Sequence, residues 1–141
     1  MKPEVKIMKL KIEYIKISED DYDALEDTSG AYRVISSDNI SWMVDGKYHR
    51  EDGPAVESDG GDKEWFFHGK LHREDGPAIE WEDGTKKWFI NDNLHREDGP
   101  AIEGRNGYKS WYLQGEHYNT EEKWEEALEI VKAKRIKDEI V

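Results

Sequence analysis

The sequence predicts a mainly β protein: an elongated antiparallel meander of 23-residue β-hairpin repeats, with an N-terminal β-rich cap and a C-terminal α-helix. Three observations predict it. A His-Arg-Glu-Asp-Gly-Pro-Ala block occurs three times, and a tryptophan and a glycine recur with the same spacing of 23 residues. Such a repeat cannot bury its apolar face alone, so neighbouring copies are expected to stack. The blocks begin at His49, His72 and His95, the tryptophans are Trp42, Trp65, Trp88 and Trp111, and the glycines are Gly61, Gly84 and Gly107.

Residues 1–39 lie outside the repeat, and we interpret them as the N-terminal β-rich cap. Alternation of apolar and polar residues predicts a strand over about residues 4–17. The acidic run at residues 18–21 resembles the start of a short helix. Further strands are predicted at residues 32–35 and, at the start of the array, at residues 40–44.

Residues 40–119 form the predicted hairpin array. In one copy, residues 77–81 and 86–90 read as two strands, because apolar residues alternate along them. Two-residue turns rich in Gly, Asn and Asp are strong hairpin signals, since these residues tolerate positive φ. The first set of turns is expected at Gly60-Gly61, Asp83-Gly84 and Asn106-Gly107, and the second at Asp45-Gly46, His68-Gly69, Asn91-Asp92 and Gln114-Gly115.

Residues 120–141 depart from the repeat, as a terminal capping element should. Thr120 has the character of an N-cap, and Glu121 and Glu122 favour the first turn of a helix. Apolar residues at helical spacing then predict an amphipathic helix over residues 121–138. We expect this helix to cover the last hairpin; the alternative is that it receives a partner.

The composition excludes several classes of protein. A formal net charge of −12 over 141 residues opposes binding to nucleic acid and to anionic membranes. There is no run of about 18 apolar residues and no apolar segment typical of a signal peptide. The absence of cysteine excludes disulfides, thiolate zinc sites and cysteine nucleophiles. We therefore expect a cytoplasmic protein, inside the host cell if a phage encodes it.

The repeated His-Arg-Glu-Asp block contains metal-ligating and acid–base residue types. Neighbouring units are about 10 Å apart in a two-strand repeat, too far for equivalent histidines to share one ion. A catalytic constellation is normally single, whereas this one occurs three times. We therefore expect no catalytic residue, no metal site and no cofactor.

A structural role for the block is the favoured interpretation. The aspartates are expected to accept hydrogen bonds from backbone N–H groups of their turn. The arginines are expected to pair with carboxylates of the same or the next unit, and the histidines to donate to backbone carbonyls. With the four repeat tryptophans, the predicted structural residues are His49, His72, His95, Arg50, Arg73, Arg96, Asp52, Asp75, Asp98, Pro54, Pro77 and Pro100.

The tryptophans permit two interpretations. They are either the core of a thin sheet or, with Phe66, Phe89 and Tyr112, an exposed ladder that stacks on bases or on choline-type cations. Stacking on nucleic acid also needs a basic groove, and residues 42–119 instead hold 10 Lys and Arg against 17 Asp and Glu.

The blocks resemble a known family, the phage-associated variants of the MORN repeat, whose core reads Leu-His-Arg-x-Asp-Gly-Pro-Ala. The match is best at residues 71–78 and 94–101, and Tyr48 stands where the first copy would have leucine. The resemblance covers about residues 40–119. It implies a β-hairpin array of the kind found in large tailed phages and some bacteria, and it implies no enzymatic activity.

Together these features predict a non-enzymatic protein-interaction module, a phage accessory protein or inhibitor of a host defence or nucleic-acid-binding protein. The partner is expected to be a host or viral protein that meets an acidic surface. The alternative is a module that binds small ligands, or choline-type groups of a cell wall, through the repeated aromatic face. The candidate interaction carboxylates are Glu51, Glu57, Glu74, Glu80, Glu97 and Glu103.

Overall fold

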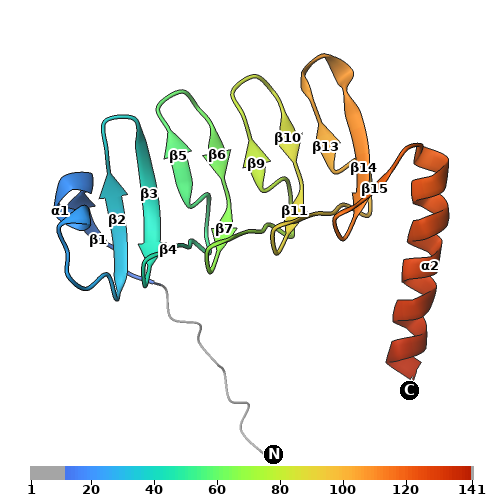
Figure 1. Cartoon of the computed structure of the whole chain (residues 1–141), viewed down its shortest axis with the longest axis horizontal. Helices are drawn as coiled ribbons and strands as arrows, with labels where there is room; N and C mark the ends of the chain where they lie inside the picture. Colours follow the sequence, from blue (N-terminus) through green and yellow to red (C-terminus); the bar gives the residue numbers. More distant parts are fainter. Residues whose placement is uncertain (1–11, 141) are drawn as a thin grey trace, which may run out of the picture.

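The computed structural model describes residues 12–140 and has a mostly β fold with one long C-terminal helix (Figure 1). Within these residues, eleven short strands form one large mixed sheet in the order β1-β2-β3-β5-β6-β9-β10-β13-β14-β15, with β4 paired to β3. The elements are β1 (Ile15–Ser18), α1 (Glu19–Asp23), β2 (Ala31–Ile35), β3 (Asn39–Val44), β4 (Lys47–Tyr48), β5 (Val56–Ser58), β6 (Lys63–Glu64), β7 (Phe66–Phe67), β8 (Lys70–Leu71), β9 (Ile79–Glu80), β10 (Lys86–Lys87), β11 (Phe89–Ile90), β12 (Asn93–Leu94), β13 (Ile102–Glu103), η1 (Arg105–Gly107), β14 (Lys109–Leu113), β15 (Glu116–Tyr118) and α2 (Glu121–Ile140).

The N-terminal part departs from a purely antiparallel meander. Strand β1 pairs in parallel with β2, because the chain returns to the sheet through helix α1. The side chain of Ser18 caps that helix, as the acidic run at residues 18–21 predicts. The strand expected over residues 4–17 begins in the structure at Ile15, and residues 4–11 of that prediction lie outside the described residues.

The long hairpins β5–β6, β9–β10 and β13–β14 lie side by side along the sheet (Figure 1). Their turns fall where the glycines predict, but each loop holds three residues rather than two. In the middle hairpin, Trp81 N donates to Thr85 O, and Gly84 N donates to Trp81 O. Gly84 has φ +91°, which supplies the left-handed third position of a three-residue loop. The sequence marks the turn but not which residue closes it.

The second set of turns has the predicted length of two residues. All eight central residues have φ between 48° and 83°, the geometry of type I′ turns. Small hairpins follow from them, including β7–β8 and β11–β12, which pair outside the large sheet. The turns are Asp45-Gly46, His68-Gly69, Asn91-Asp92 and Gln114-Gly115.

At Trp65 and Trp88 the chain leaves the large sheet and enters a small hairpin. The N–H of Trp65 still donates across the sheet to Ala78 O at 2.7 Å, while its carbonyl accepts from His72 N within the small hairpin. Trp88 makes the equivalent pair of bonds with Ala101 and His95. These two tryptophans therefore join the long hairpins to the small ones.

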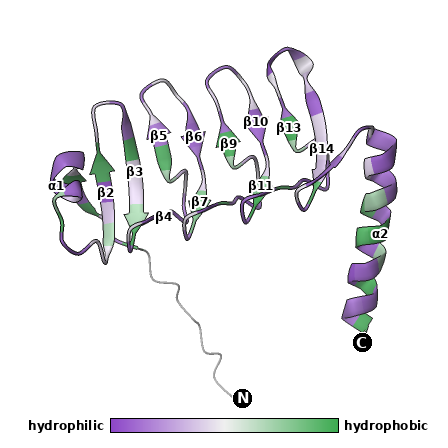
Figure 2. Ribbon diagram, in the orientation of Figure 1, coloured by the Kyte–Doolittle hydropathy of each residue, from purple (hydrophilic) through white to green (hydrophobic). Residues whose placement is uncertain are grey.

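The core is thin and is centred on small residues. Ala55, Ala78 and Ala101, which follow the prolines of the blocks, have no exposed surface. Hydrophobic residues lie on β2, β3, β5, β9 and β13, while the outer loops are hydrophilic (Figure 2). The alanine repeated after each proline is therefore the sequence signal of close packing, rather than the large aromatic residues.

Helix α2 covers the last hairpin, as its amphipathic pattern predicts. Leu113 of β14 packs against Trp124 and Leu128 of the helix, and all three side chains are buried. Thr120 caps the helix through a hydrogen bond from Lys123 N to its hydroxyl oxygen. No helix within residues 12–140 combines the length and the apolar character that a membrane crossing requires.

Candidate functional site

Each repeated block forms a loop that folds around its own arginine. We name these the first loop (residues 49–54), the second loop (72–77) and the third loop (95–100). In the second loop, Arg73 Nε donates to Asp75 Oδ1 at 3.1 Å, and Arg73 Nη1 donates to Pro77 O at 3.1 Å. The first and third loops contain the same two bonds, made by Arg50 and Arg96.

The arginines also contact a glutamate on the adjoining strand and the face of a tryptophan. Arg73 Nη1 donates to Glu80 Oε1 at 3.2 Å, and Cζ of Arg73 lies 4.0 Å from the centre of the Trp65 ring. Arg50 lies over Trp42 and Arg96 over Trp88 at 3.8 and 3.7 Å. Burial alone would lower the pKa of Arg96, but its hydrogen bonds to Glu103 and Asp98 raise that pKa above the usual value. The guanidinium groups are therefore structural centres of their loops.

The prediction that the aspartates accept hydrogen bonds from backbone N–H groups of the turn is wrong. Asp52, Asp75 and Asp98 accept from the arginine two residues earlier rather than from backbone N–H groups of the turn. The loop glycine explains how this bond forms. A Cβ at Gly76 would stand 2.9 Å from Arg73 Cζ, so only glycine lets the guanidinium lie against the loop backbone.

The histidines connect neighbouring units, but with the opposite polarity to the expected one. Nδ1 of His49, His72 and His95 accepts a hydrogen bond from a backbone N–H 19 residues further on. Each donor is the first of the two central residues of a type I′ turn. The N–H of that residue does not take part in the pairing of the two strands, so the histidine supplies its acceptor. Because Nδ1 accepts, the neutral imidazole carries its proton on Nε2, which faces a glutamate at 3.5–3.9 Å.

We expect His49→Phe to lower the free energy of unfolding by about 1–3 kcal/mol, because it leaves the His68 N–H without its acceptor. His49 is only 2% exposed, so water cannot readily replace the imidazole. His72→Phe is the matched control: the His72 side chain is 18% exposed, so water can reach the Asn91 N–H, and the loss should stay below about 1 kcal/mol. Urea denaturation measures both, and equal losses would contradict a burial-dependent role.

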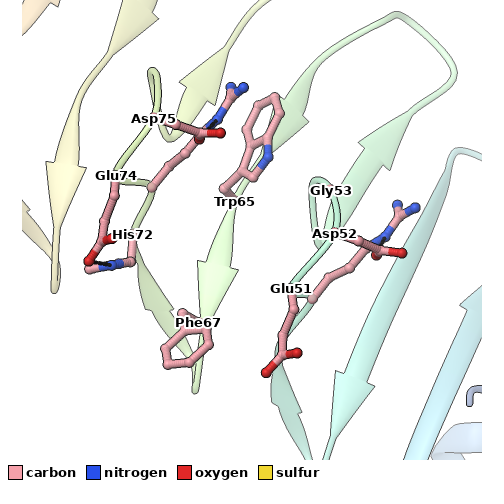
Figure 3. Close-up of a pocket in the computed structure, with 10 residues that line it drawn as sticks. Glu51, Asp52, Gly53, Trp65, Phe67, His72, Glu74 and Asp75 are labelled. Carbon is pink, nitrogen blue, oxygen red and sulfur yellow. Dashed lines mark hydrogen bonds and ion pairs between the residues drawn. The ribbon is translucent and has the colours of Figure 1, made fainter. Parts of the chain in front are cut away.

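Two grooves of the same construction lie between successive loops. The first groove, of about 790 Å³, lies between the first and second loops, and the second, of about 680 Å³, between the second and third. Figure 3 shows Trp65 and Phe67 between the two walls of the first groove. Four carboxylates and two guanidinium groups line each groove, and in the second groove one of the carboxylates, Glu97, is also paired with Arg135 of helix α2.

The six candidate interaction carboxylates separate into two sets. Glu57, Glu80 and Glu103 pair with the loop arginines at 2.7–3.7 Å and belong to the scaffold. Glu51, Glu74 and Glu97 lie beside the histidines at the groove walls. The side chain of Glu74 is 84% exposed, whereas those of Glu51 and Glu97 are 32% and 31% exposed.

The repeat tryptophans are embedded to different depths. Trp42 is buried, at 8% exposed, while Trp65, Trp88 and Trp111 are partly buried. Arginine guanidinium groups cover a face of the first three. Within residues 12–140, no group of three His, Asp or Glu side chains is arranged so that it could hold a metal ion.

Arg135 of helix α2 is a site residue that the repeat pattern does not reveal. Its two terminal nitrogens donate to the two carboxylate oxygens of Glu97. The residues are 38 positions apart, and no periodic signal relates them. This contact lowers the pKa of Glu97.

Comparison of the chain with protein families, with curated proteins and with solved structures finds no match.

Proposed function

We propose that this chain is a non-enzymatic protein-interaction module, built as an array of 23-residue β-hairpin units. The N-terminal cap and the C-terminal helix would close its two ends. The observation that carries the proposal is the pair of adjacent grooves of the same construction, each lined by four carboxylates and two guanidinium groups. Carboxylates at their rims are exposed, with Asp52 at 60%, Glu74 at 84% and Asp75 at 88%.

The bonding of the blocks supports this proposal over catalysis. Each histidine accepts a backbone hydrogen bond through Nδ1, and each arginine holds a loop together. Residues committed to such bonds are poorly placed to move protons to and from a substrate. The threefold recurrence of the arrangement is typical of a structural requirement.

The covered tryptophan faces favour a protein partner over a choline-type ligand. A quaternary ammonium group binds over the face of an aromatic ring. In Trp42, Trp65 and Trp88 a guanidinium group already lies 3.7–4.0 Å from the ring centre. The accessible chemistry of the grooves is instead that of carboxylates, which complement a basic surface.

The partner we propose is a basic protein of a bacterial host, with nucleic-acid-binding proteins as the leading class. Such proteins carry clustered Lys and Arg that neutralise phosphates. An elongated acidic array would compete with nucleic acid for that surface. The proposal therefore includes inhibition of nucleic-acid binding.

Affinity capture from a bacterial lysate tests the proposal. The full chain is compared with a Glu51→Gln, Glu74→Gln variant, and with a Glu122→Gln, Glu125→Gln variant of the same net charge. We expect one basic protein to be retained by the native chain and by the helix variant, and lost by the groove variant. Equal loss from both variants would indicate unspecific charge attraction, and choline binding without a protein partner would favour the alternative.

A further inference from the structure

At the C-terminal end of the array, helix α2 occupies the position that follows the third loop, which is equivalent to the grooves after the first and second loops. Trp111 and Leu113 occupy the places of Trp65 and Phe67 two repeats later. Leu113 is 2% exposed because helix α2 packs on it, while Phe67 at the first groove is 38% exposed. The helix thus covers at the last position a surface that is exposed at Phe67 and partly buried at Ile90.

The same helix supplies a cation to the wall of the third loop. Arg135 donates through both terminal nitrogens to the two oxygens of Glu97. Glu74 of the second loop is the equivalent residue one repeat earlier, and it stands 3.6 Å from His72 Nε2, as Glu97 stands 3.5 Å from His95 Nε2. The two carboxylates share this histidine contact, but Glu74 is 84% exposed, whereas Glu97, which Arg135 also contacts, is 31% exposed.

We propose that the second groove binds an arginine side chain from an extended segment of the partner protein, with Glu74 as its carboxylate. This inference depends on the proposed interaction function and names the chemistry of the contact. The chain's own Arg135–Glu97 pair is the template. Ile90, in the place of Leu113, supplies an apolar floor beside the carboxylate.

The spacing of the loops selects an extended segment rather than a helix. Successive loops are separated by two strands, or about 10 Å between backbone centres. A helix with its side chains is about 10–12 Å across, so it cannot enter between two such walls. Helix α2 fits at the third loop because the chain forms no fourth loop there. A single arginine side chain on an extended backbone is thin enough for the inner grooves.

The carboxylate favours arginine over lysine. A guanidinium group donates two parallel hydrogen bonds to one carboxylate, as Arg135 does to Glu97, whereas an ammonium group acts as a point charge. The guanidinium group already in the second loop, on Arg73, is bonded to Asp75, Pro77 and Glu80 and does not compete for Glu74. With Glu97 paired to Arg135, the groove still holds three carboxylates against two guanidinium groups, which favours an incoming cation.

Calorimetric titration of the full chain with a short peptide tests the site. The probe is acetylated, amidated Gly-Ser-Leu-Gly-Arg-Gly-Leu-Ser-Gly, in which the leucines share the face of the arginine when the backbone is extended. We expect saturable binding that weakens about tenfold with Glu74→Gln, and similarly when lysine replaces the arginine. Glu125→Gln, which removes the same charge from an exposed position on α2, should change the affinity less than about twofold.

Three results would overturn the site: no binding of the arginine peptide, equal weakening by the two variants, or equal affinity for the lysine peptide. Glu74 is highly exposed, and an unchanged melting temperature of the Glu74→Gln variant shows that folding is not the cause of a loss. The capture experiment does not use the peptide. A basic protein retained there without peptide binding would overturn the arginine site alone and leave the interaction function supported.

Discussion

Replacing Trp88 with alanine is expected to lower the free energy of unfolding by about 3 kcal/mol, near the lower end of the range for core aromatic residues. Trp88 is partly buried, lies on the floor of the second groove, and carries the Arg96 guanidinium 3.7 Å from its ring centre. Removing the ring takes away both the apolar contact and the platform for that arginine. Urea denaturation followed by circular dichroism measures the loss.

Trp81→Ala is the matched control for this prediction. Trp81 is a tryptophan outside the repeat register, is 38% exposed, and meets only the Lys87 ammonium group in a comparable ring contact, at 4.1 Å. Its loss should cost less than about 1 kcal/mol. A Trp88→Ala variant as stable as the native chain would instead favour an exposed aromatic ladder for ligands.

The turns show where sequence reasoning works for this chain. A two-residue turn such as Asp45-Gly46 requires positive φ at both positions, and few residue types tolerate that, so the signal is local. The three-residue loops were predicted one residue too short, because Asp83-Gly84 marks the left-handed position without marking the closing pair. That pair depends on how the two strands register across the sheet, which is a property of the whole hairpin.

The bonding within the loops was harder to predict than their recurrence. Pairing of the arginines with carboxylates follows from charge, and the structure contains it. The direction of the histidine hydrogen bonds depends on which backbone group faces Nδ1, and no sequence pattern encodes that. The contact between Arg135 and Glu97 depends on where helix α2 packs, and it therefore required the folded chain.

Replacing Arg73 with alanine is expected to lower the free energy of unfolding by about 2–3 kcal/mol, less than for a fully buried ion pair because its partners reach water. The Arg73 side chain is 22% exposed, whereas Asp75 is 88% exposed and can be solvated once the arginine is gone. The carbonyl of Pro77 and the carboxylate of Glu80 lose a donor at the same time. Thermal and urea denaturation measure the change.

The Arg73→Lys variant tests whether the loop needs the hydrogen-bonding geometry of the guanidinium group or only its positive charge. Lysine keeps the positive charge but cannot donate to Asp75, Pro77 and Glu80 at once while lying flat on Trp65, so it should recover less than about half of the loss. Full recovery by lysine would contradict the proposed fork of hydrogen bonds.

The equivalent alanine variants should follow the strength of the glutamate contact, which is 2.7 Å for Arg96, 3.2 Å for Arg73 and 3.7 Å for Arg50. The largest loss is therefore expected at the third loop and the smallest at the first, and the reverse order would show that these contacts do not set the stability of the sheet.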